Sequence, residues 1–364
     1  MSAFKKLALA ATAVALFAGQ AMAEDKVVNV YNWSDYIGPT VLEDFTKETG
    51  IKVVYDTMDS NEVLETKLFA GNSGYDVVFP SATFASRQIK AGVFQKIDKS
   101  KLSNYKELWP KIMENLAVYD PGNEYLVDYT WFTTGISYNV DKAKAVYGDQ
   151  PMNSWEVVFK PENLAKFKDC GVYFLDSPED VLTAALKYQG KDPGSTDKKD
   201  IQEAGKMLEA LRPYVKKFHS SEYINALANG DICIAIGWAG DTYQAKARAE
   251  EAKNGVKVDY VVPKEGTLMS MDTMAIPKDA KNVEAAHAFI NYMLRPDVAA
   301  KNADATKFAS GVLAAKPLVD KAITDNPQIY LSDEMLAKTY TVQPYGPKVQ
   351  PIVTRTWTRV KTGQ

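Results

Sequence analysis

Two segments of the chain place a tryptophan close to a carboxylate, directly after a β-rich run. Residues 32–36 have the sequence NWSDY and residues 236–241 the sequence IGWAGD. An ammonium group has only hydrogen-bond donors, so carboxylates and hydroxyls suit it, while aromatic faces attract cations and cover methylene groups. A helix-capping loop would explain one polar residue in the first segment, but not readily the rings beside it. These side chains favour the capture of a small organic cation.

Three further loops carry polar side chains next to predicted strands. Residues 176–180 (DSPED) and 269–272 (MSMD) each end in an aspartate, and residues 80–83 (PSAT) follow a third strand. Helix capping explains residues 80–83 about as well as ligand binding does, and a single carboxylate is most often a solvated surface group. None of the four carboxylate-bearing loops contains Lys or Arg, which argues against a carboxylate or phosphate ligand. A desolvated ammonium needs an acid at each charged end of a closed site.

Enzymatic motifs are missing from the sequence. It contains no G-x-S-x-G, H-E-x-x-H or P-loop, and residues 190–196 have only a phosphate-like composition without the required spacing. His219 has no partner motif, so a structural role is favoured over that of a general base. Paired carboxylates could serve a glycosidase, and that alternative stays open. We expect no catalytic residue, no metal site and no cofactor.

The composition is that of an ordinary globular protein. The chain has 364 residues, a net charge of -3 and 46% hydrophobic residues, which excludes disorder and collagen and predicts two domains. No basic stripe points to nucleic acid.

Residues 1–23 combine a basic start, a short apolar run and a small-x-small exit, so we expect a signal peptide cleaved after Ala23. In an exported protein Cys170 and Cys233 would pair, with free thiols as the alternative.

The elements that must position these side chains alternate between strands and helices. This alternation predicts parallel strands with helical crossovers, and hence two α/β domains with a cleft between them. Ligands of such sheets lie at the carboxyl ends of strands. The predicted strands are 27–31, 51–55, 75–79, 172–175, 232–236, 256–262 and 273–276, and the predicted helices include one capped by Asn61 and others over 201–211, 223–228, 245–252 and 283–294.

Motifs along the whole chain after residue 23 resemble the polyamine-binding periplasmic proteins of bacterial ABC importers, most closely the putrescine-type receptors. The resemblance implies a type II periplasmic binding protein fold with two α/β lobes and a ligand cleft between them. The matching segments are 30–37 (VYNWSDYI), 73–78 (SGYDVV), 218–221 (FHSS), 227–231 (LANGD), 235–241 (AIGWAGD), 260–266, 294–297 and 354–358. The expected division is 24–134 for lobe 1, 135–260 for lobe 2, 261–325 for the return to lobe 1, and 326–364 for a segment packing across both.

The resemblance also implies a ligand site. Trp33 and Trp238 would enclose the alkyl chain of the ligand. Ser34 and Asp241 would hold one ammonium, while Asp272 and, partly through water, Asp180 would face the other. The remaining residues implied to line the site are Asp35, Tyr36, Ser81, Thr83, Ser270 and Phe308.

Three of these positions depart from the family pattern. Ser270 stands where familiar receptors carry an aromatic residue, Phe308 aligns with a tyrosine, and Asp180 replaces a glutamate. The distal end of the pocket should therefore be larger or differently shaped, which leaves putrescine, cadaverine, agmatine, spermidine and an ω-amino acid as candidate ligands. Cys170 and Cys233 match a cysteine pair that is bridged in the putrescine-type receptor.

The resemblance further implies a monomer that delivers its ligand to an inner-membrane ABC permease, with no enzymatic activity. A sensory rather than an import role stays an alternative. An extracellular hydrolase is the alternative from another class.

Overall fold

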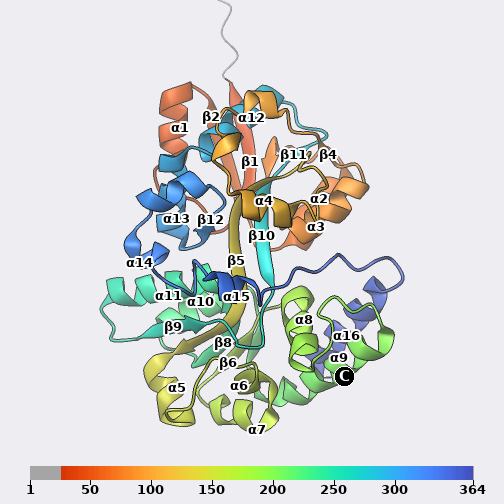
Figure 1. Cartoon of the computed structure of the whole chain (residues 1–364), viewed down its shortest axis with the longest axis vertical. Helices are drawn as coiled ribbons and strands as arrows, with labels where there is room; N and C mark the ends of the chain where they lie inside the picture. The colour runs from red at the N-terminus through yellow and green to blue at the C-terminus, as the bar shows by residue number, and fades with distance from the viewer. Residues whose placement is uncertain (1–25, 364) are drawn as a thin grey trace, which may run out of the picture.

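The computed structural model describes residues 26–363, so the expected signal peptide and its cleavage site lie outside the described residues. The molecule consists of two α/β lobes, one above the other, with the long strand β5 (Val127–Asn139) running from one into the other (Figure 1). One hydrophobic cluster lies mainly in the first lobe and another in the second, and the first cluster also includes Ala239 and Tyr243 from the second lobe. The predicted two-lobed α/β architecture is therefore confirmed, while the residue boundaries of the lobes stay a prediction.

Strands and helices are distributed along the whole of the described chain. The strands are β1 (Val27–Trp33), β2 (Lys52–Met58), β3 (Val77–Val78), β4 (Phe94–Gln95), β5 (Val127–Asn139), β6 (Val172–Phe174), β7 (Lys217–Phe218), β8 (Ile234–Trp238), β9 (Val258–Val261), β10 (Met269–Met274), β11 (Ile276–Pro277) and β12 (Ala309–Ser310). The helices are α1 (Val41–Thr49), α2 (Asn61–Ala70), α3 (Ala82–Lys90), α4 (Pro110–Leu116), α5 (Val140–Tyr147), α6 (Glu156–Phe159), α7 (Pro161–Leu164), α8 (Pro178–Tyr188), α9 (Lys198–Leu211), α10 (Glu222–Ala228), α11 (Ala239–Ala252), α12 (Val283–Met293), α13 (Pro296–Thr306), α14 (Lys321–Thr324), α15 (Asp333–Leu336) and α16 (Gln350–Thr362).

The first sheet confirms the predicted parallel arrangement. Its order is β2-β1-β3, and β1 pairs in parallel with both neighbours. Helix α1 ends at Gly50, whose φ of 70° is the left-handed conformation that glycine adopts at little cost. The cap of α2 differs from the prediction, because Ser60, not Asn61, accepts the backbone N–H of Val63 at 3.2 Å.

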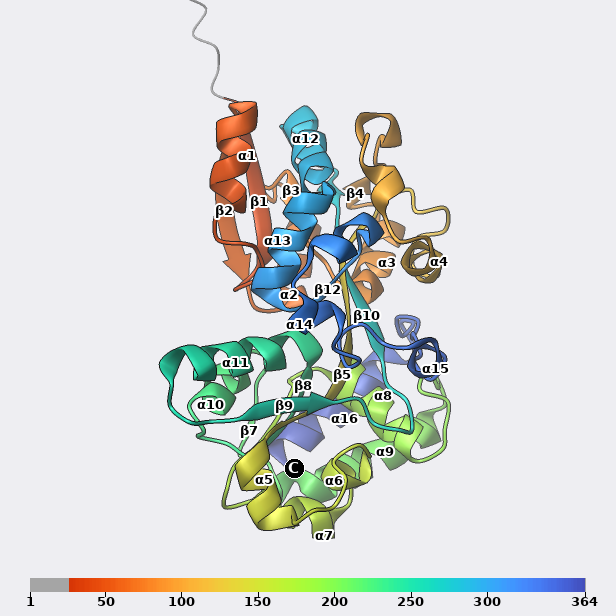
Figure 2. The same ribbon diagram turned by 60° about the vertical axis from the view of Figure 1, so that its left-hand side comes forward.

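The second sheet is mixed, so the expectation of parallel strands holds there only in part. Its order is β10-β5-β8-β6-β7, with β9 and β12 also pairing with β5. Strand β6 pairs in parallel with β7 and β8, whereas β5 is antiparallel to β8, β9, β10 and β12. The first half of β5 pairs with β10 and β12 and the second half with β8 and β9, which ties the two lobes together (Figure 2).

Two long-range connections stabilise the second lobe. The expected disulfide joins Cys170 to Cys233, with a Cα–Cα distance of 5.5 Å across a separation of 63 residues. The C-terminal helix α16 contributes Val353 and Trp357 to the core of the second lobe. Tyr330, earlier in the same segment, is part of the core of the first lobe.

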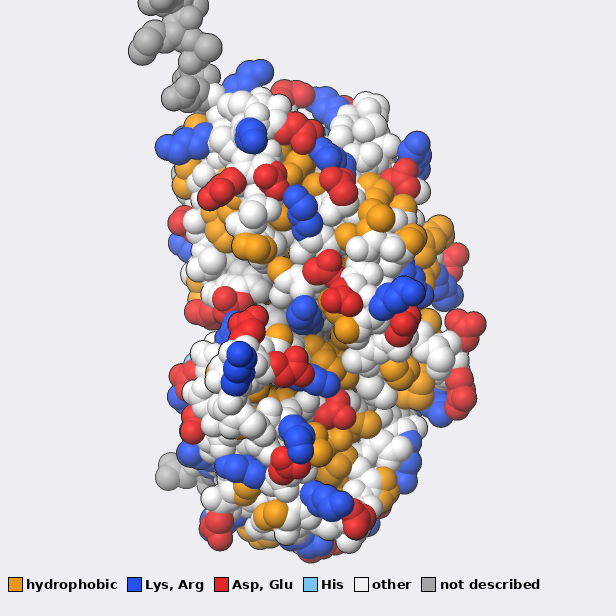
Figure 3. Space-filling model, turned by 90° about the vertical axis from the view of Figure 1, so that its left-hand side faces the viewer, with side chains coloured by type: hydrophobic (Ala, Val, Ile, Leu, Met, Phe, Trp, Pro, Cys, Tyr) orange, Lys and Arg blue, Asp and Glu red, His pale blue; other side chains and the backbone are white. Residues whose placement is uncertain are grey.

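The surface shows no region dominated by one sign of charge on the face seen in Figure 3, where basic and acidic side chains are interspersed. Within residues 26–363, no helix combines the length and the apolar character needed to cross a membrane.

Candidate functional site

Asp272 is a buried carboxylate held by two hydroxyls of the first lobe. Contrary to the expectation of a loop, it lies inside β10, where only 4% of the residue is exposed. Tyr36 donates to Oδ2 at 2.9 Å and Ser81 donates to Oδ1 at 2.6 Å. The Tyr36 hydroxyl also lies 2.6 Å from Oγ1 of Thr130, on β5. Burial raises the pKa of Asp272 to about 6, although the hydrogen bonds from Ser81 and Tyr36 oppose the rise.

Asp241 is a second buried carboxylate, in the first turn of α11. The helix begins immediately after Trp238, so Asp241 belongs to a helix rather than to the expected strand-exit loop. The Tyr223 hydroxyl donates to its Oδ2 at 2.9 Å and accepts the backbone N–H of Trp238 at 3.0 Å. Burial raises the pKa of Asp241 to about 7, with the Tyr223 hydrogen bond and the charge of Arg248 acting against it.

Asp180 is a third buried carboxylate, near the start of α8, whose capping residue is Ser177. Ser177 donates to Oδ2 at 2.6 Å, Trp238 donates from Nε1 to Oδ1 at 3.0 Å, and Thr134 of β5 also donates to Oδ1. Burial raises the pKa of Asp180 as well. The indole of Trp238 is thereby fixed in place by a carboxylate of the same lobe.

The three carboxylates converge although they come from separate elements. The charge of Asp272 contributes to the raised pKa of Asp241, and that of Asp180 to the raised pKa of Asp272, so they are close enough to repel one another. None of the three forms an ion pair with a Lys, Arg or His side chain within residues 26–363. Buried carboxylates without a cationic partner are costly, and an incoming cation would relieve that cost.

Aromatic side chains connect these acids. Trp33 ends β1 and donates from Nε1 to the carbonyl of Phe79 at 2.8 Å. Phe308 makes an edge-to-face contact with Tyr36, with ring centroids 5.0 Å apart. Gly240 packs directly on the Phe308 ring, because a Cβ at position 240 would overlap it. Phe308, from the first lobe, thus lies against the start of α11 in the second.

The structure places two of the expected residues at the exposed rim of the candidate site. Ser34 is exposed and donates to Asp59 at 3.0 Å. Asp35 is also exposed, has a φ of 56°, and pairs with Arg248 of α11 at 3.2 Å. This ion pair joins the two lobes at the rim of the site, and the charges of Asp35 and Arg248 act in opposite directions on the pKa of Asp241.

Ser81 and Thr83 have different surroundings. Ser81 is in the N-cap position of α3 but makes no capping hydrogen bond with its side chain, and its hydroxyl contacts Asp272 instead. Asn61 supports this geometry, since it bonds both the backbone N–H and the hydroxyl of Ser81 at 3.0 Å. Burial and the charge of Asp180 raise the pKa of Glu179 to about 8, and a hydrogen bond with Thr83 opposes the rise.

Several residues of this cluster were not predicted. Tyr223, Thr130, Thr134 and Glu179 hold or neighbour the expected acids. Strand β5 itself was not among the predicted strands, although its richness in aromatic and β-branched residues is a strand signal.

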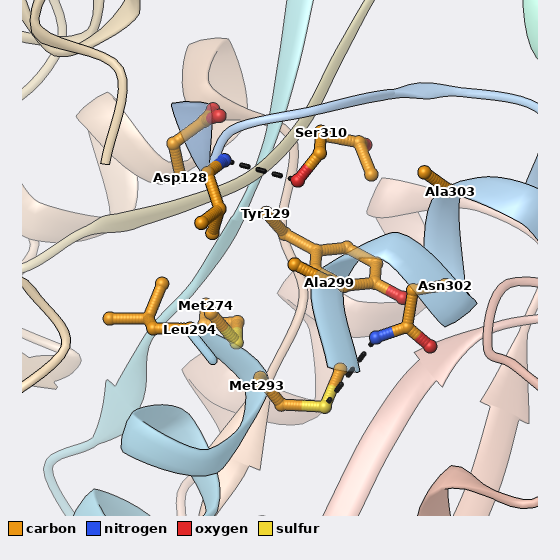
Figure 4. A pocket seen from close by; sticks show the side chains of 11 residues that line it. Asp128, Tyr129, Met274, Met293, Leu294, Ala299, Asn302, Ala303 and Ser310 are labelled. Carbon is orange, nitrogen blue, oxygen red and sulfur yellow. Dashed lines mark hydrogen bonds between the residues drawn. The ribbon is translucent and has the colours of Figure 1, made fainter. Parts of the chain in front are cut away.

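A small cavity lies beside this cluster, in the first lobe (Figure 4). Asp128 lines it, is fully buried, and has no hydrogen-bond partner for either carboxylate oxygen among the described residues. Burial raises the pKa of Asp128 well above its usual value, with a smaller contribution from Asp272. The cavity offers about 10 Å³, roughly the space of one water molecule, so it does not hold an organic ligand.

Comparison with known proteins identifies the family. The sequence profile described as bacterial extracellular solute-binding protein matches residues 40–331. This chain belongs to that family. Its relatives bind solutes for transport and are not enzymes, and the same holds for this chain.

The similarity extends over whole chains. The putrescine-binding periplasmic protein SpuD of Pseudomonas aeruginosa (strain UCBPP-PA14) is 55% identical, with 100% of both chains covered. The putrescine-binding periplasmic protein PotF of Escherichia coli (strain K12) is 52% identical, over 98% of this chain and 97% of PotF. The structure of the spermidine/putrescine ABC transporter substrate-binding protein PotD from Streptococcus pneumoniae superposes with a TM-score of 0.77 at 28% identity, over 93% of this chain and 99% of PotD.

Proposed function

We propose that this solute-binding protein captures a linear polyamine in the periplasm, putrescine or a related amine, and delivers it to an ABC permease of the inner membrane. The observation that carries the proposal is the convergence of Asp180, Asp241 and Asp272, which are buried and form no ion pair with a Lys, Arg or His side chain among the described residues. The whole-chain similarity to putrescine-binding proteins supports the same ligand class.

The ligand would complete an electrostatic arrangement that the free protein leaves unfavourable. One ammonium would donate to Asp272, whose oxygens already accept from Tyr36 and Ser81. The second would donate to Asp241 or Asp180, both of the second lobe. Trp33 and Trp238 would cover the methylene chain, since indole faces suit both methylenes and cations.

Closure of the lobes would follow from these contacts. The acids and rings come from both lobes, so the closed conformation alone offers the ligand all of its partners, and the ligand shifts the population towards it. The Asp35–Arg248 pair and the contact of Gly240 with Phe308 would be made in the same closed state.

Binding experiments test the proposal directly. Isothermal titration calorimetry of the purified protein should show saturable binding of at least one of putrescine, cadaverine, agmatine and spermidine. An ω-amino acid such as γ-aminobutyrate should bind at least about tenfold more weakly, because its carboxylate would face buried acids. No binding of any of these amines would contradict the proposal.

Genetic tests separate import from sensing. A strain that lacks the protein should take up the labelled amine more slowly. Unchanged uptake with a lost transcriptional response to the amine would favour the sensory alternative. Cleavage after Ala23 and a monomeric state belong to the same proposal, and mass spectrometry and sedimentation of the exported protein would check them.

A further inference from the structure

One face of β5 lies along the candidate site from end to end. Successive residues of a strand alternate between faces, so Thr130, Phe132 and Thr134 share one face. Thr130 contacts the Tyr36 hydroxyl that donates to Asp272. Thr134, four residues further on, donates to Asp180. Phe132 therefore stands midway between the hydroxyls that support the acids at the two ends of the site.

The register of the sheet explains why a large ring fits at this point. Phe132 is directly opposite Ser270 of β10, and Thr130 is directly opposite Asp272. Directly opposed residues of antiparallel strands project from the same face with their Cβ atoms about 5 Å apart. Ser270 is small and partly exposed, so the ring opposite it has room over this face.

Ring contacts extend from Phe132 in both directions. Its centroid lies 5.0 Å from that of Phe308 and 6.1 Å from that of Trp238, both in edge-to-face geometry. Phe308 in turn contacts Tyr36 edge to face. The four rings form a continuous aromatic row, and each end donates to a buried carboxylate: Tyr36 to Asp272, and Trp238 to Asp180.

We propose that Phe132 is a specificity-determining residue of the site, whose ring forms the apolar floor beneath the methylene chain of a linear dication held between Asp272 and the acids of the second lobe. The inference rests on the proposed polyamine-binding function. It places an aromatic wall on β5, directly opposite Ser270 of β10, so Ser270 does not simply enlarge the pocket. Because the two side chains are directly opposed on one face, a large ring at position 270 would compete with the ring of Phe132 for the space beside the ligand.

A four-protein cycle tests this exchange, with putrescine and spermidine affinities measured for the wild type, Phe132→Ala, Ser270→Phe and the double variant. Phe132→Ala should weaken binding about tenfold, as expected for loss of apolar cover over several methylenes. Ser270→Phe alone should also weaken binding, because two rings compete for one space. The double variant should bind within a few-fold of the wild type.

Controls separate this role from simple core packing. Phe132→Leu keeps most of the buried volume, so its melting temperature without ligand should stay close to that of the wild type while its affinity falls several-fold. Additive losses in the cycle, or an unchanged affinity for Phe132→Leu, would overturn the assignment of Phe132 and leave the proposed function intact. Absence of amine binding by the wild type would instead refute the proposed function.

Discussion

The affinity of the protein for a diamine should fall steeply as the pH is lowered from about 8 to about 5. Burial raises the pKa of Asp241 to about 7 and that of Asp272 to about 6 in the free protein. An alkylammonium has a pKa of about 10.4, so the ligand stays charged throughout this range. Each acid that is protonated in the free protein must release its proton before it can pair with an ammonium, and affinity is therefore lost on the acid side of each pKa.

The two pKa values set the size of the effect. At about pH 5, deprotonation costs a factor of roughly 100 at Asp241 and roughly 10 at Asp272, which together amount to roughly 1,000-fold relative to about pH 8. At about pH 6.5, Asp241 is mostly protonated and Asp272 mostly ionised, so binding should release about one proton per ligand. In the proposed complex, the site would exchange protons for a dication.

Titration calorimetry of putrescine binding measures both quantities. The affinity follows from isotherms across the pH range, and the released protons follow from the heats in two buffers with different ionisation enthalpies. Asp272→Asn should weaken binding about 10- to 100-fold at about pH 8, through loss of a charge-assisted hydrogen bond, and should make the pH dependence shallower. Glu334→Gln is the matched control, because the side chain of Glu334, on α15, is 80% exposed and its ion pair is with Lys338.

An affinity that stays constant between about pH 8 and about pH 5 would refute this reasoning, since it would mean that neither acid titrates in the free protein or that neither meets the ligand. Proton release that persists unchanged in both Asp241→Asn and Asp272→Asn would assign the titration to other groups.

Three further results are expected. Asp128→Asn should stabilise the protein by about 1–3 kcal/mol at about pH 8 in urea denaturation, because the buried, unpartnered Asp128 has a raised pKa and its ionised form is costly. Since the pKa of Asp128 is higher in the folded than in the unfolded protein, this gain in stability should shrink as the pH falls towards about 4. A gain that does not change with pH would contradict this account. Replacing Cys170 and Cys233 by serine should lower the free energy of unfolding by about 4 kcal/mol, measured by urea denaturation without reductant. This is the value that the chain-entropy model of disulfide stabilisation gives for their separation, and equal stability of the wild type and the variant would argue against that model. Asp35→Asn, which breaks the exposed pair with Arg248, should change putrescine affinity less than about fivefold in calorimetry, whereas a 100-fold loss would move Asp35 into the ligand site.

Much of the architecture could be predicted because its signals are local. The alternation of strands and helices over the first 60 residues after residue 23, and the glycine that ends α1, depend on neighbouring residues alone. The boundaries were less accurate where the chain continues directly from strand into helix. Trp238 ends β8 and Ala239 begins α11 without a loop, so Asp241 was expected in a loop that does not exist.

The sequence by itself determined the two-lobed α/β class, the one disulfide pairing that two cysteines allow, and the segments that bring tryptophan, hydroxyl and carboxylate together, because those features lie in short contiguous motifs or in the cysteine count. Only the tertiary structure decided which of these side chains meet. The register that sets Phe132 opposite Ser270 joins strands 138 positions apart in the chain, and a shift by one residue would have turned Phe132 to the other face. Burial decides the rest: the lobes remove Asp241 and Asp272 from water and raise their pKa values, while Asp35, from an equally suggestive motif, stays at the rim.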